Sequence, residues 1–426
     1  MTKDTNNFDV IVIGAGAAGL MAAITTARNG KSVLLIEQLS QIGAKLKATG
    51  GGRCNLSNTL SNEAFMASFG KDGRFMTPAL EAFNHHALVA FFDSLGVQSH
   101  APDGHRIFPI THDSTTIIKA FENELQRLSI TLLCSAKVKC LLRDDVQMQG
   151  VLAGEGAYRA THIIVATGGL GYPTLGASGD GFNFASELGH TITPLFPAMM
   201  PLHVKETWVK NCRADTIGKA QVRIDLPKVK VRASGDLIFT SKGIRGPVVL
   251  DFAREITPLL EKYGEVPLSL NLVKGLNEEQ IRLHLKHEAL QNPEQSILLH
   301  VSTLMPQSVA QEVCTSVQIN PHERFSKLGG QDKDRLIAYL ANTPLTVIGH
   351  DGFKSAMITR GGVSLKEINP QSMESKRVKG LYFCGEVMNL DGPCGGFNLQ
   401  WAFSSGYLAG SLLRFEKKSA KIEDKN

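Results

Sequence analysis

A glycine-rich turn near the N-terminus constrains this chain more than any other feature. The apolar run Phe8–Ile13 leads directly into Gly14, Gly16 and Gly19, an apolar helix follows, and Glu37 closes a second apolar run. Gly14 would permit a tight turn out of a strand, Gly16 would let a pyrophosphate approach the backbone, and Gly19 would let the helix pack closely on the sheet. The helix N-terminus would offer free N–H groups to phosphates, and Glu37 would accept hydrogen bonds from ribose hydroxyls. The spacing therefore predicts a β-α-β unit that binds an adenine dinucleotide.

Further glycine-rich segments favour a flavin over a nicotinamide cofactor. They are Gly50–Asn55, Ala166–Gly169, and Gly385–Glu386 with Asp391–Asn398. A nicotinamide dehydrogenase does not need such loops along its whole chain, whereas FAD is long enough to meet all of them. The last loop opens an apolar helix, Leu399–Leu413, whose N-terminus would stabilise the charge of a reduced flavin by about 0.3–2 kcal/mol. We therefore expect non-covalently bound FAD, with its ADP half at the fingerprint and its isoalloxazine at the last helix.

The composition is that of an ordinary globular protein. Of 426 residues, 43% are hydrophobic and 20% are charged, and the formal net charge of +5 does not by itself argue for nucleic acid. The start of the chain lacks a signal-peptide layout, and no run approaches the roughly 18 apolar residues of a membrane span. The scattered cysteines form no CxxC pair, so we expect neither disulfides nor zinc, and a reducing, cytoplasmic location. They are Cys54, Cys134, Cys140, Cys212, Cys314, Cys384 and Cys394.

The expected fold class is α/β, with a Rossmann-like FAD-binding domain that is discontinuous in sequence. Its first part would cover residues 1–194, and its second part, with the C-terminal helix, residues 347–426. The sequence pattern of residues 195–346 differs from that of the two flanking parts. Closely spaced prolines are followed by short alternating runs typical of strands and then by a polar helical stretch. We expect these residues to form an inserted β-barrel-like and helical domain.

Local patterns predict several elements. Asp113 or Ser114 would cap a helix over Thr115–Leu128, whose apolar residues recur at helical spacing. Gly150–Gly156 has no helix after it and predicts a hairpin, so a separate NAD(P) domain is not expected. The charged tail Glu416–Asn426 is expected to fray. Short strands are expected at Ala136–Leu142, Gln149–Ala153, His162–Ala166, Ala220–Leu226, Leu237–Thr240, Ala356–Thr359 and Leu381–Cys384.

Stretches from end to end of the chain carry a family resemblance: Gly14–Gly19, Gly43–Asn55, Asp103–Pro109, Ala166–Pro173, Ser178–Gly181, Gly243–Pro247, Thr359–Val363, Met373–Lys376 and Gly380–Ala402. With them the chain resembles the YhiN-type, aminoacetone oxidase-like family of FAD-dependent oxidoreductases, which includes a bile-acid intermediate reductase. The resemblance implies a FAD domain with an inserted barrel-like and helical domain, and it extends more distantly to fumarate reductases and aspartate oxidases. The family often has Thr or Ser at Cys394 and Tyr at Phe397, so no role is carried over for that tyrosine hydroxyl.

The motifs and the resemblance together nominate residues that would bind FAD, but no catalytic acid or base and no metal ligand. Cys54 and Cys394 lie in cofactor-facing loops without a partner cysteine, so packing or cofactor contact is favoured over a redox thiol. His284 and His287 have metal-ligand spacing, but with no third ligand nearby they are predicted to lie on a solvated helix face. The nominated residues are Gly14, Ala15, Gly16, Ala17, Ala18, Gly19, Glu37, Gln38, Lys45, Gly51, Gly52, Arg53, Cys54, Asn55, Val138, Ala166, Thr167, Gly168, Gly169, Asp180, Gly385, Glu386, Gly395, Gly396, Phe397 and Asn398.

The predicted function is hydride transfer between flavin N5 and a small organic substrate, with the protein supplying orientation and electrostatics. NAD(P)H as a transient co-substrate and oxygen as an electron acceptor both stay open. Two alternatives remain: a flavoprotein that modifies RNA, and a FAD-binding regulator without turnover. Because no basic run interleaved with aromatics is present, no nucleic-acid partner is expected, nor is a membrane partner. The sequence leaves the oligomeric state open.

Overall fold

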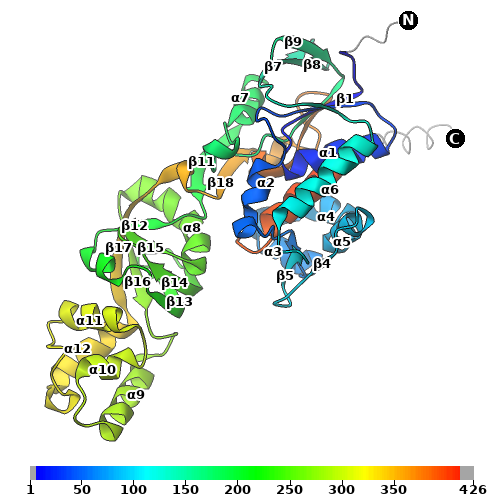
Figure 1. The fold of residues 1–426 in the computed structure, drawn as a ribbon. Helices are drawn as coiled ribbons and strands as arrows, with labels where there is room; N and C mark the ends of the chain where they lie inside the picture. The colour runs from blue at the N-terminus through cyan, green and yellow to red at the C-terminus, as the bar shows by residue number, and fades with distance from the viewer. Residues whose placement is uncertain (1–5, 413–426) are drawn as a thin grey trace, which may run out of the picture. The chain divides into compact units, whose positions relative to one another are not determined.

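The computed structural model describes residues 6–412, which divide into two compact units (Figure 1). The first unit consists of residues up to 195 together with those from 358 onward, and the second unit is residues 196–357. The chain leaves the first unit along β11 (Ile192–Ala198) and returns along β18 (Ile358–Val363). Each unit has its own buried apolar core. Among the described residues, no helix is both long and apolar enough to span a bilayer.

The first unit is built on a parallel sheet with strand order β19-β10-β1-β2-β6. The central strand β1 (Val10–Ile13) pairs with β2 (Val33–Ile36) and with β10 (His162–Val165). The outer strands are β6 (Thr131–Leu133) and β19 (Leu381–Phe383). Strands β1, β2 and β19 are apolar and buried along their whole length, as is typical of a parallel sheet covered on both faces. Because β19 comes from the end of the chain, the sheet is complete only when the chain returns from the second unit.

Glycines let the last helix lie directly against the fingerprint helix. Helix α1 (Ala17–Arg28) packs on α13 (Phe397–Gly410). A Cβ at Gly406 would lie 2.3 Å from the Ala18 carbonyl oxygen, and one at Gly410 would lie 2.4 Å from another carbonyl oxygen of α1. Neither position tolerates a side chain, so these glycines bring the C-terminal part of the domain to the start of α1.

The remaining elements of the first unit form two smaller three-stranded sheets and several helices. The hairpin strands β7 and β8 pair with each other, and β8 pairs with β9. The elements are α2 (Ala44–Ala48), β3 (Ser57–Asn58), α3 (Asn62–Ala67), α4 (Thr77–Ala82), α5 (His85–Ser94), β4 (Ser99–His100), β5 (Arg106–Pro109), α6 (Ser114–Arg127), β7 (Val138–Arg143), β8 (Met148–Ala153), β9 (Gly156–Arg159) and α7 (Asp180–Glu187).

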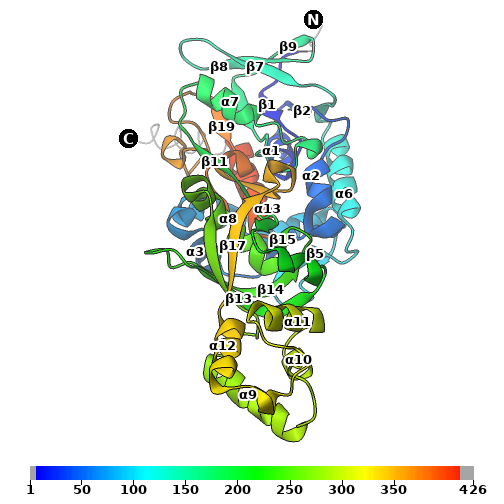
Figure 2. The same cartoon turned by 90° about the vertical axis from the view of Figure 1, so that its left-hand side faces the viewer.

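The second unit is a closed antiparallel barrel with strand order β12-β15-β14-β13-β16-β17, and its helices α9–α12 gather at one end of it (Figure 2). Strand β12 pairs with both β15 and β17, which closes the barrel. The strands are β12 (Leu202–Val204), β13 (Thr216–Ile224), β14 (Arg232–Phe239), β15 (Gly243–Arg245), β16 (Val266–Asn271) and β17 (Thr343–His350). The helices are α8 (Pro247–Tyr263), α9 (Glu278–Gln291), α10 (Ile297–Ser302), α11 (Gln307–Ser316) and α12 (Gly330–Ala341).

The expected α/β class with an inserted barrel and helices is confirmed. The helix predicted over 115–128 forms as α6, and Asp113 caps it by accepting a hydrogen bond from the Thr115 N–H. The insert boundary predicted at residue 346 is wrong, because this position lies inside β17, which pairs with β12 and β16. Helix α8 was not expected, since Pro247 and Pro258 interrupt its apolar pattern. The tail Glu416–Asn426 lies outside the described residues.

Candidate functional site

The three glycines of the fingerprint differ in what surrounds them. Gly14 has a φ of +98°, and a Cβ there would lie 2.6 Å from the Ala166 carbonyl oxygen. A Cβ at Gly19 would lie 1.8 Å from the Gly14 carbonyl oxygen. At Gly16, by contrast, no protein atom lies within 4 Å of an added Cβ. Gly14 and Gly19 therefore serve packing of the turn and the helix, while Gly16 leaves an open face that a ligand can approach.

The N-terminus of α1 is open to an anion. Its N-cap residue, Gly16, provides no side-chain cap, and no acidic residue lies in the first turn. The first N–H groups of a helix have no partner within the helix, and the helix dipole makes this end positive. The twelve-residue helix α1 thus presents the donors and the electrostatic potential that a pyrophosphate requires.

Glu37 directly follows β2 and is buried, with the residue 9% exposed. One carboxylate oxygen accepts a hydrogen bond from the Ala15 N–H at 2.8 Å, and the other accepts one from the Leu39 N–H at 2.9 Å. Each oxygen retains a further lone pair, so the carboxylate is still able to accept a ribose hydroxyl. The structure also gives Glu37 a role that the sequence did not suggest, because it holds the fingerprint loop in place.

Segments far apart in sequence meet at the fingerprint loop. The Gly43 N–H donates to the Ala15 carbonyl oxygen at 2.9 Å. The Ala166 N–H donates to the Ile13 carbonyl oxygen at 2.9 Å, so the loop after β10 starts beside the fingerprint. A Cβ at Gly385 would lie 2.8 Å from the Ala18 Cβ. The stretch that leads into Gly50–Asn55 and the starts of the two other glycine-rich segments therefore lie close to the fingerprint.

An ion pair joins two of these segments. Lys45 Nζ lies 2.7 Å from one carboxylate oxygen of Glu386, and the other oxygen accepts a hydrogen bond from the Thr359 N–H at 2.9 Å. The Thr359 hydroxyl accepts a hydrogen bond from the Leu170 N–H at 2.7 Å. A Cβ at Gly169 would overlap both the Thr359 hydroxyl and the Glu386 carboxylate. Thr359 was not nominated from sequence, because its contacts depend on segments about 30 and 190 residues away.

Several nominated glycines leave open space. No protein atom lies within 4 Å of a Cβ built at Gly51, Gly52 or Gly168. Thr167, which precedes Gly168 in the loop after β10, has a buried hydroxyl that lies close to Gly181 and has no hydrogen-bond partner among the described residues. The open glycines leave the backbone of these loops accessible to a long ligand, and contact of the Thr167 hydroxyl with FAD stays a prediction.

The turn before α13 is organised by protein contacts. With the Asn55 amide oriented to satisfy its neighbours, its oxygen accepts the Gly396 N–H at 3.0 Å and its nitrogen donates to the Ser57 carbonyl oxygen at 2.9 Å. Gly396 has a φ of +86°, and a Cβ there would lie 2.4 Å from that same carbonyl oxygen. Gly396 is therefore tightly packed, with Ser57 as its close neighbour. Its N–H has this protein partner, and its contact with FAD stays a prediction.

The next residues of this turn also have structural contacts. The Phe397 ring is buried, with its centroid 4.9 Å from that of Phe65. The Asn398 side chain accepts the Gly392 N–H and donates to the Gly392 carbonyl oxygen, both at 2.9 Å. The Gly395 carbonyl oxygen accepts a hydrogen bond from a side chain of β3. These contacts fix the loop that opens α13, and a direct role of the three residues toward FAD stays a prediction.

Cys54 is buried in a left-handed conformation, with φ at +59°. Burial raises the pKa of its thiol to about 12, against the weak opposing effect of the neighbouring Thr49 hydroxyl. A thiol of this kind is not a nucleophile near neutral pH.

Cys394 is exposed and forms no disulfide. Arg53 is exposed, with its guanidinium 5.4 Å from the centre of the Phe108 ring.

The other nominated side chains have protein partners. The Gln38 side chain donates to the Gly176 carbonyl oxygen, and Asp180 pairs with Lys137 at 3.0 Å. Val138 is buried in β7. These three positions flank the strand end that carries Glu37, and their contact with FAD stays a prediction.

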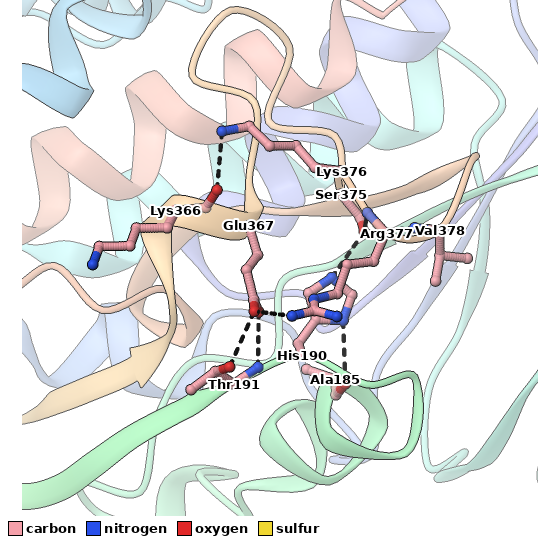
Figure 3. Close-up of polar contacts among 9 residues, drawn as sticks. All are labelled: Ala185, His190, Thr191, Lys366, Glu367, Ser375, Lys376, Arg377 and Val378. Carbon is pink, nitrogen blue, oxygen red and sulfur yellow. Dashed lines mark hydrogen bonds and ion pairs between the residues drawn. The ribbon is translucent and has the colours of Figure 1, made fainter.

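A buried serine–histidine pair lies elsewhere in this unit (Figure 3). The Ser375 hydroxyl oxygen accepts N–H groups of Arg377 and Val378 at 3.0 and 2.9 Å, so its own proton points to His190 Nε2 at 2.8 Å. His190 Nδ1 lies 3.2 Å from the Ala185 carbonyl oxygen, to which it donates. The ring is therefore neutral, and burial lowers its pKa. Because both ring nitrogens have partners, His190 is not available as a catalytic base.

Beside this pair, Glu367 anchors the same two chain segments (Figure 3). It accepts hydrogen bonds from the Thr191 N–H at 2.8 Å and hydroxyl at 3.0 Å, and it pairs with Arg377. Burial alone would raise the pKa of Glu367, but the Arg377 and Thr191 contacts outweigh it and lower the pKa to about 2. The network is structural, and it ties the 365–378 segment to the start of β11.

No metal site was expected, and within residues 6–412 no group of three or more His, Cys, Asp or Glu side chains could hold a metal ion. His284 Nε2 lies 2.8 Å from the Thr303 hydroxyl. His287 is exposed on the same helix.

Comparison with known proteins identifies the family. The model of the family described as HI0933-like protein Rossmann domain matches residues 8–412. The chain belongs to this HI0933-like family. A 3-dehydro-bile acid delta(4,6)-reductase of Clostridium scindens is 31% identical, over 94% of this chain and 97% of the relative. A ribosomal RNA dihydrouridine synthase of Escherichia coli is 28% identical, over 97% of this chain and 99% of the relative.

A solved structure shares the fold. The 3-ketosteroid delta1-dehydrogenase of Sterolibacterium denitrificans has a TM-score of 0.55 at 12% identity, covering 95% of this chain and 99% of that chain. The fold of this HI0933-like protein is thus the Rossmann-type FAD-binding fold of FAD-dependent oxidoreductases. The narrower aminoacetone oxidase-like assignment stays a prediction.

Proposed function

We propose that this chain is a FAD-dependent oxidoreductase that moves a hydride between flavin N5 and a carbon of a C=C bond conjugated with a carbonyl group. The main structural support for FAD as the cofactor is the open, uncapped N-terminus of α1 beside the buried carboxylate of Glu37. When bound, the flavin supplies two-electron chemistry that no side chain can perform.

The names of two full-length relatives support the type of bond. One is a reductase of Δ4,6 bonds in a 3-dehydro bile acid, and the other makes dihydrouridine, which is uridine saturated at its 5,6 bond. In both substrates, the unsaturated 3-dehydro bile acid and uridine, the C=C bond is conjugated with a carbonyl group. A carbonyl group activates the β-carbon for hydride, so a single flavin mechanism serves both.

The residues of this chain would divide the work as follows. The N–H groups at the start of α1 would bind the pyrophosphate, and Glu37 would bind the adenosine ribose while holding the fingerprint loop. Lys45, kept in place by Glu386, would provide a fixed positive charge within the cofactor site. NAD(P)H is proposed as the transient reductant. We nominate no side chain as the proton donor.

Two measurements test this function. Acid or heat should release FAD, identified by mass spectrometry, from yellow purified protein. The anaerobic protein should then be reduced with NADH, NADPH or light and mixed with a conjugated steroid enone, a uridine-containing RNA, a quinone or oxygen. We expect reoxidation by a conjugated C=C compound, with the saturated ketone as a matched control that does not react. Release of FMN alone, or equal reoxidation by enone and saturated ketone, would contradict the proposal.

The remaining alternatives are separated by the same experiment. A regulator without turnover would hold FAD yet be reoxidised by none of the organic acceptors. Aminoacetone, added to the oxidised protein, tests the narrower family assignment through flavin reduction. All seven cysteines are free, which supports the proposal of a reducing, cytoplasmic location.

A further inference from the structure

One stretch of the barrel unit carries as much net positive charge as the whole chain. Between Lys205 and Arg245 there are ten Lys and Arg residues and four Asp and Glu residues, a net charge of +6, against +5 for all 426 residues. The rest of the chain is therefore close to neutral. All ten cationic side chains are exposed: Lys205, Lys210, Arg213, Lys219, Arg223, Lys228, Lys230, Arg232, Lys242 and Arg245.

The acidic residues of this stretch do little to balance these cations. Glu206 accepts a hydrogen bond from a backbone N–H of β17 at 2.9 Å, and Asp236 accepts one from a backbone N–H of β13 at 3.1 Å. Asp215 accepts a hydrogen bond from a serine of α11. Three of the four carboxylates thus have partners within the barrel unit, and the two that are exposed are Asp225 and Asp236.

Few of the cations have an acidic partner. Among the described residues, only Lys205 of the ten forms an ion pair, with Glu265 at 3.4 Å. The other nine cationic side chains project into solvent without one. An unbalanced positive surface of this kind attracts polyanions and raises their association rate.

Two arginines are placed directly opposite each other on the barrel. Arg223 of β13 and Arg232 of β14 are cross-strand partners, so their side chains share one face of the sheet. Like charges in this position destabilise a strand pair. The connection between the two strands adds Lys228 and Lys230, both exposed. Repulsion between these cations therefore destabilises the folded barrel, and a bound anion would reduce that repulsion.

We propose that this basic hairpin, defined by Arg223, Lys228, Lys230 and Arg232, binds the phosphate backbone of RNA. Backbone binding needs cations at the surface and no aromatic-interleaved motif, so the lack of such a motif in the sequence does not oppose it. Insertion into a membrane surface is disfavoured, because an inserting amphipathic element also needs exposed apolar side chains. Among the described residues from 205 to 245, no large hydrophobic side chain is exposed.

The inference rests on the proposed function, in which RNA uridine is already one of the acceptors tested, and it adds the surface that would hold such an RNA. The 5,6 bond of uracil is conjugated with the C4 carbonyl, and RNA is the nucleic acid that carries uracil. Saturation would place the hydride on C6, the position β to that carbonyl, and a solvent-derived proton on C5. The electron pair comes from the reduced flavin of the proposed function, which a nicotinamide reduces in turn.

The test compares two variants of equal charge change. R223Q/R232Q removes the opposed arginines, and K119Q/K286Q removes two exposed lysines on α6 and α9. The probe is a fluorescein-labelled RNA stem–loop with uridines in its loop, followed by anisotropy at several KCl concentrations. In R223Q/R232Q we expect about tenfold weaker binding and a log–log salt slope lower by about 1.4–1.8, from roughly 0.7–0.9 per phosphate contact. K119Q/K286Q should bind as the parent does.

Three results would overturn the inference: a parent that does not bind the RNA, an R223Q/R232Q variant that binds as the parent does, or equal losses in both variants. Binding to phosphatidylserine vesicles that RNA does not compete with would point to a membrane and also refute it. Flavin content and reoxidation by a steroid enone are measured on the same preparations. If enone turnover persists while RNA binding is absent, the RNA inference fails and the proposed function stands. If RNA binding follows the hairpin charge but no flavin is held, the proposed function fails instead.

Discussion

Replacing Glu37 by glutamine separates the two roles that the structure gives this carboxylate. Its oxygens accept the Ala15 and Leu39 N–H groups at 2.8 and 2.9 Å, and the residue is buried. Glutamine keeps the shape but turns one acceptor into an NH₂ group that faces a donor. The substitution therefore breaks one buried hydrogen bond in the apoprotein and removes a charged acceptor from the ribose site.

The magnitude follows from these contacts. A hydrogen bond to a charged group contributes about 1.5–3 kcal/mol. Loss of that amount from the FAD complex corresponds to roughly 10- to 150-fold weaker binding, at about 1.4 kcal/mol per tenfold. Apo Glu37→Gln should also unfold about 1–3 kcal/mol more easily than the apo parent, because an N–H group at the fingerprint loop loses its partner.

Titration of apoprotein with FAD, followed by quenching of flavin fluorescence, measures the first effect, and urea unfolding without FAD measures the second. Asp9→Asn is the matched control. Asp9 accepts the Ser32 N–H at 2.8 Å just before the start of β1, whereas the fingerprint follows the end of that strand. The control should lose stability and keep its FAD affinity. Unchanged FAD affinity in Glu37→Gln, or equal weakening in both variants, would refute the assignment of the fingerprint.

Three further outcomes are expected. Gly396→Ala should unfold at clearly lower urea than the parent, because its Cβ would lie 2.4 Å from a Ser57 backbone oxygen at a φ of +86°; an unchanged urea midpoint would show that this turn is not so tight. Stability should fall on acidification: Glu367 has a pKa lowered from 4.5 to about 2, so its contribution is full above about pH 4.5 and is lost as the pH falls toward 2. The lowered pKa of His190 adds a loss that begins as the pH falls below its ordinary 6.5, and urea midpoints across this range measure both effects. Cys54, whose pKa is raised to about 12, should resist iodoacetamide at pH 8 until the protein unfolds, and mass spectrometry of alkylated peptides would reveal early labelling.

The fingerprint turn, helix α6 and the hairpin of β8 and β9 could be predicted from the sequence. The fingerprint depends on residues within one turn, where a tight bend, an open backbone and a close helix contact each require glycine at a set spacing. Helix α6 and the hairpin of β8 and β9 likewise depend on near neighbours, through the Asp113 cap and a short turn. Helix α8 was not predicted, because two prolines interrupt its helical pattern. It forms because its apolar face packs into the core of the barrel unit.

What a residue touches across the fold was decided only by tertiary structure. The sequence identified the glycine-rich turn before α13, but packing showed that Gly396 lies against Ser57 and not against an open face. Composition showed a net charge of +5, yet only the register of β13 and β14 sets Arg223 opposite Arg232. The physical reason is the same in both cases. Spacing along the chain determines local conformation, whereas contacts between segments far apart in sequence depend on how sheets and barrels close.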